Sequence, residues 1–212
     1  MSQRRKLSEL TLSVIDTETT HLSPAKGGRI AEIAIVRIEA GGEITDRYET
    51  LVNPFGDVGR SDIHGISQAM ADAAPSFADV VPEISERLVG TVVVAHNIAF
   101  DWPFVVAEFD RTGTPAPDAT RICTLRGARA RLGLTSNTLA KCCETFGIEL
   151  INAHCALDDT VATAQLALVM IARAEAAGRG YVADRAWFDQ VVATADLTSF
   201  AARPRRRDAL VA

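Results

Sequence analysis

Residues 10–18, LTLSVIDTE, begin with apolar and β-branched side chains and end in a pair of acidic ones. The apolar part predicts a β-strand. The chain then turns through residues 21–28, which contain a proline and two glycines, and residues 29–38, RIAEIAIVRI, are again rich in Ile and Val. Gly41-Gly42 is typical of a hairpin turn, and residues 43–52 predict a third strand. The domain is therefore expected to open with three antiparallel strands.

Beyond these strands the sequence pattern alternates between helices and strands. Apolar residues at helical spacing predict a helix over residues 75–88. The short apolar run TVVVA at residues 91–95 is typical of a strand that is buried on both faces. Further elements are expected at residues 99–111 (helix), 121–124 (strand), 139–146 (helix) and 157–177 (helix). This alternation predicts an α/β domain.

The composition limits the possible functions. The chain is 48% hydrophobic and 23% charged over 212 residues, which fits one globular domain with a tail. A formal net charge of -5 argues against a protein that coats nucleic acid through clustered Lys and Arg, so any nucleic-acid contact must be local. No apolar run approaches the roughly 20 residues that span a bilayer. We therefore expect a cytoplasmic location and no membrane contact.

Four cysteines are present, Cys123, Cys142, Cys143 and Cys155, and none is paired in a CxxC spacing. We expect all of them to be reduced. A zinc site that combines the last three with His154 is excluded because no pair has the spacing of zinc ligands.

Asp16 and Glu18 stand two residues apart at the end of the first predicted strand. Side chains alternate between the faces of a strand, so both carboxylates are expected on one face. Like charges held this close raise each other's pKa or recruit a cation, and hard oxygen ligands suit Mg²⁺ or Mn²⁺. Taken alone, the pair also fits a solvated strand end.

Asp101 lies in the first turn of the helix that follows the buried strand at residues 91–95. Ligand sites in open α/β sheets gather at the carboxyl ends of strands, so Asp101 can face Asp16 and Glu18 across a shared cleft. The alternative is that Asp101 only complements the helix dipole.

His154 is a loop histidine followed five residues later by Asp159, at the expected start of the long helix. An imidazole can take a proton from an activated water, and a nearby carboxylate can hold the metal that activates it. Taken alone, His154 also fits an exposed loop residue, and Asp158 or Asp159 fits an acid at a helix N-terminus.

Three segments together resemble a known family: DTETT at 16–20, HNIAFDWPF at 96–104 and HCALDD at 154–159 are similar, in order, to the three motifs of the DEDD exonucleases. The histidine in the third motif indicates the histidine subclass, which includes the proofreading epsilon subunit of bacterial DNA polymerase III. The resemblance covers roughly residues 8–175. Three motifs in the right order are far more specific than any one of them.

The resemblance implies an α/β ribonuclease H-like fold, a five-stranded mixed sheet of three antiparallel and then two parallel strands, flanked by helices. It also implies two divalent cations, Mg²⁺ or Mn²⁺, held by Asp16, Glu18, Asp101 and Asp159. Asp16 would bridge both ions, and His154 would be the general base. The expected reaction is 3′-to-5′ removal of nucleoside 5′-monophosphates.

Three further residues are expected to contact the substrate: His64, in a turn that resembles the family's contact to the terminal nucleotide, Asn97 and Thr17. Asn97 fits a structural role at the strand end equally well. The expected partners are a single-stranded DNA or RNA 3′ end and a DNA polymerase subunit. A non-catalytic accessory module is the alternative, and its sequence mark would be a missing carboxylate.

The domain organisation follows from these patterns. We expect residues 1–178 to form the ribonuclease H-like exonuclease domain, and residues 179–212 to form a C-terminal helix and a basic tail. The helix is expected around residues 187–192, and the tail contains the run RPRRR at 203–207. Such a run can hold nucleic-acid backbone, engage a polymerase or remain solvated.

Overall fold

The computed structural model describes residues 6–179 and 188–190. Its first three strands are antiparallel, as the sequence predicts: β1 (Leu12–Thr19), β2 (Ile30–Ile38) and β3 (Ile44–Leu51). Gly41 and Gly42 both have φ of 95°, a left-handed backbone that glycine adopts without steric cost. The hairpin turn between β2 and β3 therefore lies where the glycine pair indicates.

Two strands continue the sheet in parallel with β1. They are β4 (Val92–Ala95), which pairs with β1, and β5 (Arg121–Cys123), which pairs with β4. In the described part of the chain the strand order is β3-β2-β1-β4-β5-β6. The predicted five-stranded mixed sheet of three antiparallel and two parallel strands is thus confirmed, and a sixth short strand extends it.

That sixth strand corrects one prediction. A helix was expected around residues 187–192, but Phe188–Gln190 form β6, which pairs antiparallel with β5. A segment this short is compatible with either state, and the open edge of β5 supplies backbone partners that a local pattern cannot reveal. The basic run at 203–207 lies outside the described residues.

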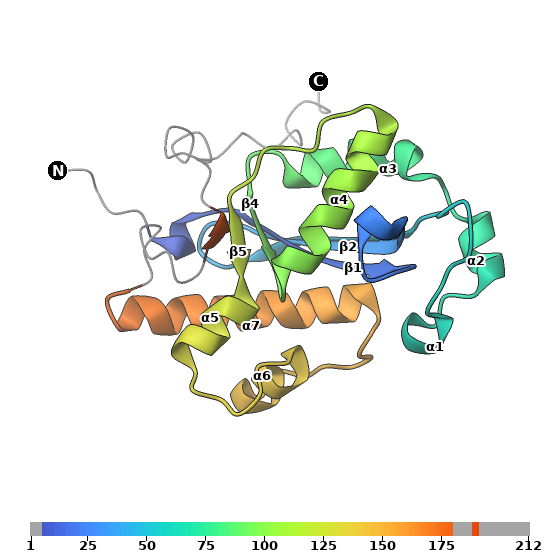
Figure 1. Cartoon of the computed structure of the whole chain (residues 1–212). Coiled ribbons are helices and arrows are strands. Elements are labelled where there is room, and N and C mark those ends of the chain that lie inside the picture. The colour runs from blue at the N-terminus through green and yellow to red at the C-terminus, as the bar shows by residue number, and fades with distance from the viewer. Residues whose placement is uncertain (1–5, 180–187, 191–212) are drawn as a thin grey trace, which may run out of the picture.

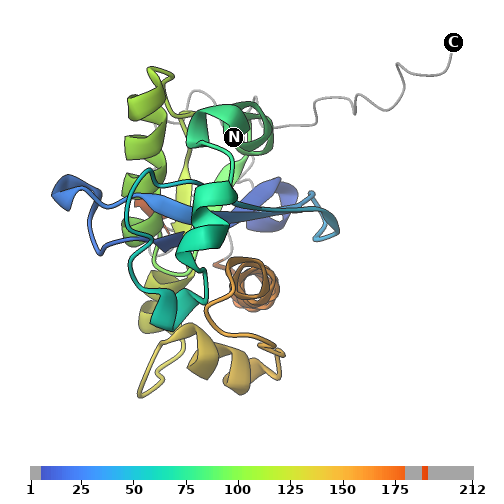
Figure 2. The same ribbon diagram turned by 90° about the vertical axis from the view of Figure 1, so that its right-hand side faces the viewer.

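Helices cover both faces of the sheet, so the domain has three layers (Figures 1 and 2). One side carries α3 and α4, and the other carries α7 with α5 and α6. The helices are α1 (Ser61–His64), α2 (Gln68–Ala73), α3 (Phe77–Leu88), α4 (Ile98–Thr112), α5 (Thr124–Arg131), α6 (Leu139–Phe146) and α7 (Ala156–Ala176), with 3₁₀ turns at η1 (Leu7–Glu9) and η2 (Pro24–Lys26).

The alternation of β1 divides its side chains between two cores. Leu12 and Val14 are buried on the side of α7, whereas Ile15 is buried with the side chains of α3 and α4. This division fixes where the next residues of β1 point, because successive side chains of a strand face opposite sides. Asp16 and Glu18 continue the row toward α7, and Thr17 continues the row toward α4.

None of the helices in residues 6–179 combines the length and the apolar character needed to cross a bilayer.

Candidate active site

The acidic end of β1 lies beside an acidic residue of the neighbouring strand. Asp16 is paired across the sheet with Ala34, and Glu18 is paired with Glu32 on β2. Because Asp16 and Glu18 share the face that α7 covers, a polar group at the start of α7 can reach both of them.

Asp101 approaches from the opposite layer, in the first turn of α4. Its side chain is buried, with 4% of the residue exposed, and its Oδ1 accepts two hydrogen bonds from Thr17. The backbone N–H of Thr17 donates at 3.1 Å and the Thr17 hydroxyl donates at 2.9 Å. The carboxyl group of Asp101 is thereby fixed to β1 between Asp16 and Glu18.

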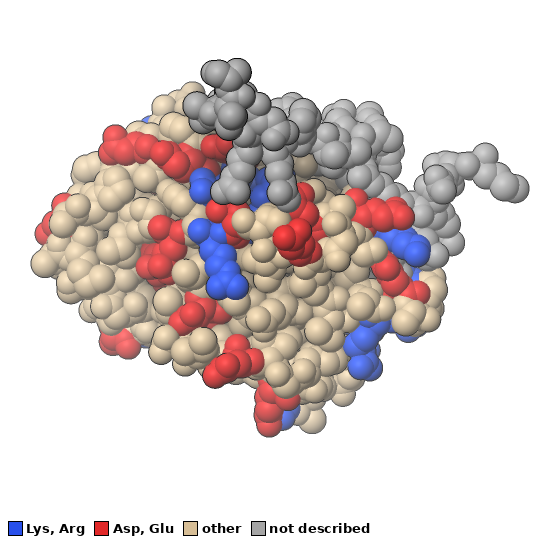
Figure 3. Space-filling model, turned by 180° about the vertical axis from the view of Figure 1, so that it is seen from behind, with Lys and Arg blue, Asp and Glu red and all other residues tan. Residues whose placement is uncertain are grey.

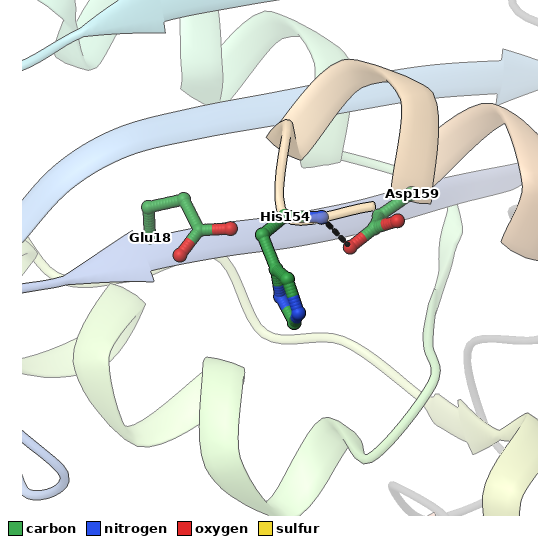
Figure 4. Close-up of side chains that lie close together, drawn as sticks. All are labelled: Glu18, His154 and Asp159. Atoms are coloured by element: carbon green, nitrogen blue, oxygen red, sulfur yellow. Dashed lines mark hydrogen bonds between the residues drawn. The ribbon is translucent and has the colours of Figure 1, made fainter. Parts of the chain in front are cut away.

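The third segment brings His154 and Asp159 to the same place. Ligand atoms of Glu18, His154 and Asp159 all lie within 4.8 Å of one another (Figure 4). The backbone N–H of His154 donates to Asp159 Oδ2 at 3.1 Å, which closes the turn before α7. His154 has φ of 72°, a left-handed conformation that costs a non-glycine residue about 1–2 kcal/mol. Backbone strain of this kind is concentrated at functional sites.

Burial and mutual repulsion make these carboxyl groups hard to ionise. The pKa of Asp16 is raised well above its usual range, first by burial and then by the charges of Asp101, Asp159, Glu18 and Glu32. Burial, with the charge of Glu32, raises the pKa of Glu18 to about 8. Burial raises the pKa of Asp101 to about 7, although its hydrogen bonds from Thr17 oppose the rise. Burial also raises the pKa of Asp159.

The donor set fits divalent cations that prefer oxygen. A cluster of carboxylates becomes ionised without large cost only when positive charge lies between its members. Oδ1 of Asp159 is buried and finds no hydrogen-bond partner among residues 6–179 and 188–190, so this oxygen is available to bind a cation. Carboxylate oxygens are the ligands of Mg²⁺ and Mn²⁺.

The three predicted substrate contacts lie in different surroundings. Asn97 is exposed and has φ of 97°, and its side chain makes no capping bond within the described chain. His64 is 9% exposed, and its Nδ1 accepts the backbone N–H of Ile66 at 3.1 Å. Burial lowers the pKa of His64. Thr17 is 5% exposed, and its hydroxyl donates a hydrogen bond to Asp101. Asn97 is thus the most accessible of the three.

Sequence reasoning missed two acidic residues near the cluster, Glu32 and Glu49. Burial and the charge of Glu49 raise the pKa of Glu32 to about 7. The sequence did contain a sign that Glu32 belongs to the site. Glu32 is the one acid inside the apolar run at 29–38, and the antiparallel pairing of this strand with β1 places it beside Glu18.

One face of the molecule can be compared with the expectation that any contact to a polyanion is local. On the face seen in Figure 3, the acidic and basic side chains of the described residues are interspersed. They do not gather into one basic surface there.

Comparison with known proteins places the same segments in one family. The exonuclease family model matches residues 13–167. The chain is 35% identical over 170 residues to a protein of Thermotoga maritima named DNA polymerase III PolC-type, covering 79% of the chain and 12% of that protein. It is 34% identical over 177 residues to a DNA polymerase III subunit epsilon-like protein of Rhodobacter capsulatus, covering 81% of the chain and 25% of that protein.

Among solved structures, exonuclease X in complex with 5′ overhanging duplex DNA superposes with a TM-score of 0.62 at 28% identity. The match covers 77% of this chain and 93% of that one. The chain spans only a small part, 12% and 25%, of the two curated relatives above.

Proposed function

The chain is a nuclease domain that belongs to the exonuclease family, and we propose that it hydrolyses DNA from the 3′ end, releasing nucleoside 5′-monophosphates from single-stranded or frayed termini. The observation that carries the proposal is the convergence of carboxylates from β1, α4 and α7 on Asp16, with His154 beside Glu18 and Asp159. Sites whose titratable groups are this strongly perturbed are candidates for catalysis.

Asp16, Glu18, Asp101 and Asp159 would hold two divalent cations, Mg²⁺ or Mn²⁺. Asp16 is the best candidate for a shared ligand because its pKa responds to the charges of the other three. When bound, such cations supply positive charge that neutralises the scissile phosphate and favours ionisation of the attacking water.

His154 would act as the general base. The water oxygen attacks phosphorus, its proton passes to an imidazole nitrogen of His154, and the bond from phosphorus to the leaving 3′ oxygen breaks. The leaving oxygen takes a proton from solvent. His154 is exposed and close to Glu18 and Asp159, so it can reach a water held beside the carboxylates.

DNA is favoured over RNA as the substrate by the relatives that carry DNA polymerase III names and by the likeness to exonuclease X. The DNA polymerase III names of these relatives also favour a replicative polymerase as the partner of this chain and proofreading as its role. A mispaired 3′ end frays more easily, since unpairing a matched end costs a few kcal/mol.

The test uses end-labelled single strands of DNA and RNA of matched sequence, with Mg²⁺, with Mn²⁺ and with a chelator. We expect digestion from the 3′ end of DNA, dependent on cation and lost in Asp16→Ala. Duplexes with mispaired 3′ ends should be digested faster than paired ones. Faster digestion of RNA would reassign the substrate, and absence of digestion of either strand would favour a non-catalytic binding module.

A further inference from the structure

The start of α7 is held by side chains of the sheet rather than by its own N-cap residue. The first N–H groups of a helix have no partner inside the helix and need an acceptor elsewhere. The side chain of Cys155, the N-cap residue, makes no capping bond within the described chain. Instead, Ala156 N–H donates to Glu32 Oε2 at 3.4 Å, and Leu157 N–H donates to Glu49 Oε1 at 3.2 Å.

Glu49 makes one more contact to this turn. The thiol of Cys155 donates to the same Oε1 at 3.8 Å. Cys155, Ala156 and Leu157 are therefore all hydrogen-bonded to glutamates of β2 and β3. A carboxylate suits this position because the N-terminus of a helix carries partial positive charge.

The two glutamates belong to the same sheet face as the acidic residues of β1. Glu32 is the cross-strand partner of Glu18. Glu49 pairs with Ala34, which in turn pairs with Asp16. Glu32 therefore lies one strand away from Glu18, and Glu49 lies two strands away from Asp16. Both glutamates hold the start of α7.

We propose that Glu32 and Glu49 are positioning residues that hold the first turn of α7 in register with β1, so that His154 and Asp159 stay beside Asp16 and Glu18. This inference rests on the proposed nuclease function. The two bonded amides lie between His154 and Asp159 in sequence, so a movement of this turn displaces both residues. Catalytic groups must be held within about 0.5 Å of their productive geometry, and a displacement of about 1 Å can cost about 100-fold in rate.

The test compares Glu32→Ala and Glu49→Ala with Glu32→Gln and Glu49→Gln, and uses Glu43→Ala as a matched control. Glu43 is an exposed glutamate next to β3. Three quantities are measured on the full chain: Mn²⁺ affinity by calorimetry, hydrogen exchange of residues 154–160, and steady-state digestion of single-stranded DNA.

The Ala variants should bind Mn²⁺ about 10- to 100-fold more weakly, the range seen when residues that support metal ligands are removed. Exchange at residues 154–160 should speed up, and kcat should fall more than KM changes. The Gln variants should recover most of each loss, because an amide oxygen still accepts the N–H, and Glu43→Ala should match the unmodified chain.

Mn²⁺ affinity and exchange within about twofold of the unmodified chain in the Ala variants would overturn the proposal. Gln variants as defective as the Ala variants would also overturn it, since they would indicate a direct metal ligand. If the unmodified chain digests no nucleic acid, the proposed function fails, while Mn²⁺ binding and exchange still decide the role of the two glutamates.

Discussion

Thr17 donates both its backbone N–H and its hydroxyl to one oxygen of Asp101, at 3.1 Å and 2.9 Å. Thr17 lies between the two acidic residues of β1, and Asp101 lies in the first turn of α4. The pair of bonds therefore joins the two layers at the point where the carboxylates meet. It also opposes the effect of burial on the pKa of Asp101, because donors to a carboxylate stabilise its ionised form.

Replacing Thr17 by valine removes the hydroxyl and preserves the shape of the side chain. We expect the rate of DNA digestion to fall by about 10- to 100-fold, as for other residues that support a metal ligand. The pKa of Asp101 should rise further, so the variant should need a higher pH for half-maximal activity. Thr17→Ser keeps the donor and should retain most of the activity. Equal rates for Thr17→Val and the unmodified chain would show that the hydroxyl has no part in catalysis.

The sequence was sufficient to predict strands β1 to β5 and the approach of Asp101 to Asp16 and Glu18. Strand period places Asp16 and Glu18 on one face, and the end of a buried strand places Asp101 nearby. These are local patterns combined with one general property of α/β sheets. The alternation of helices and strands predicts the α/β class, and the resemblance of three motifs to the DEDD exonucleases implies the ribonuclease H-like sheet.

The remaining features depend on contacts between distant residues. Glu49 reaches α7 only because the register of β3 against β2 is known, and β6 forms only because β5 has an open edge. No local pattern contains this information, since the residues that pair in each case are far apart in sequence.

Glu108 forms buried ion pairs with Arg29 and Arg111, and we expect its loss to lower the stability of the fold strongly. Glu108, whose side chain is 1% exposed, accepts Arg29 Nε at 2.7 Å and Arg111 Nη1 at 3.1 Å. Removing one partner of a buried pair leaves an uncompensated charge and costs about 3–5 kcal/mol. We expect Glu108→Ala to lower the free energy of unfolding by about 3 kcal/mol, because Arg29 is partly exposed and can be solvated.

Denaturant unfolding of Glu108→Ala measures this loss. Asp110→Ala is the control, because Asp110 is an exposed acid of the same helix. A loss for Glu108→Ala no larger than that of the control would contradict the importance of the buried pair.

Asp16→Asn should separate activity from stability. The variant keeps the size of the side chain but removes the charge that the other carboxylates repel. We expect digestion to fall by more than about 100-fold, beyond the loss typical of a supporting residue. The melting temperature of the metal-free protein at alkaline pH should rise, since relief of such repulsion is worth about 0.5–2 kcal/mol. A lower melting temperature would mean that Asp16 contributes to folding in another way.

His154→Asn tests the general base without disturbing the backbone. Asparagine tolerates the left-handed conformation that His154 adopts, so the turn before α7 should persist. The value of kcat should fall by about 10²- to 10⁴-fold, the usual contribution of a general base. Mn²⁺ affinity by calorimetry should stay close to that of the unmodified chain. A matching loss of Mn²⁺ affinity would identify His154 as a metal ligand instead of the base.

The raised pKa values predict how the stability of the metal-free protein depends on pH. The folded chain holds protons on Glu18 up to about pH 8 and on Asp101 up to about pH 7, whereas the unfolded chain releases them near pH 4. The folded state therefore binds more protons, and this stabilisation is present at low pH and lost as pH rises through 7 to 8. With a chelator, the melting temperature should fall between about pH 5.5 and about pH 8.5.

Partial exposure of Glu18 reduces the effect, so we expect a loss of about 1 kcal/mol, or about 2–4 °C for a chain of this size. Excess Mn²⁺ stabilises the ionised carboxylates and should raise the melting temperature more at the higher pH. Glu18→Gln should flatten the pH dependence, and Glu43→Gln should leave it unchanged. A metal-free melting temperature that rises over this range, or an equal response to Mn²⁺ at both ends of it, would contradict a cluster of carboxylates built to receive cations.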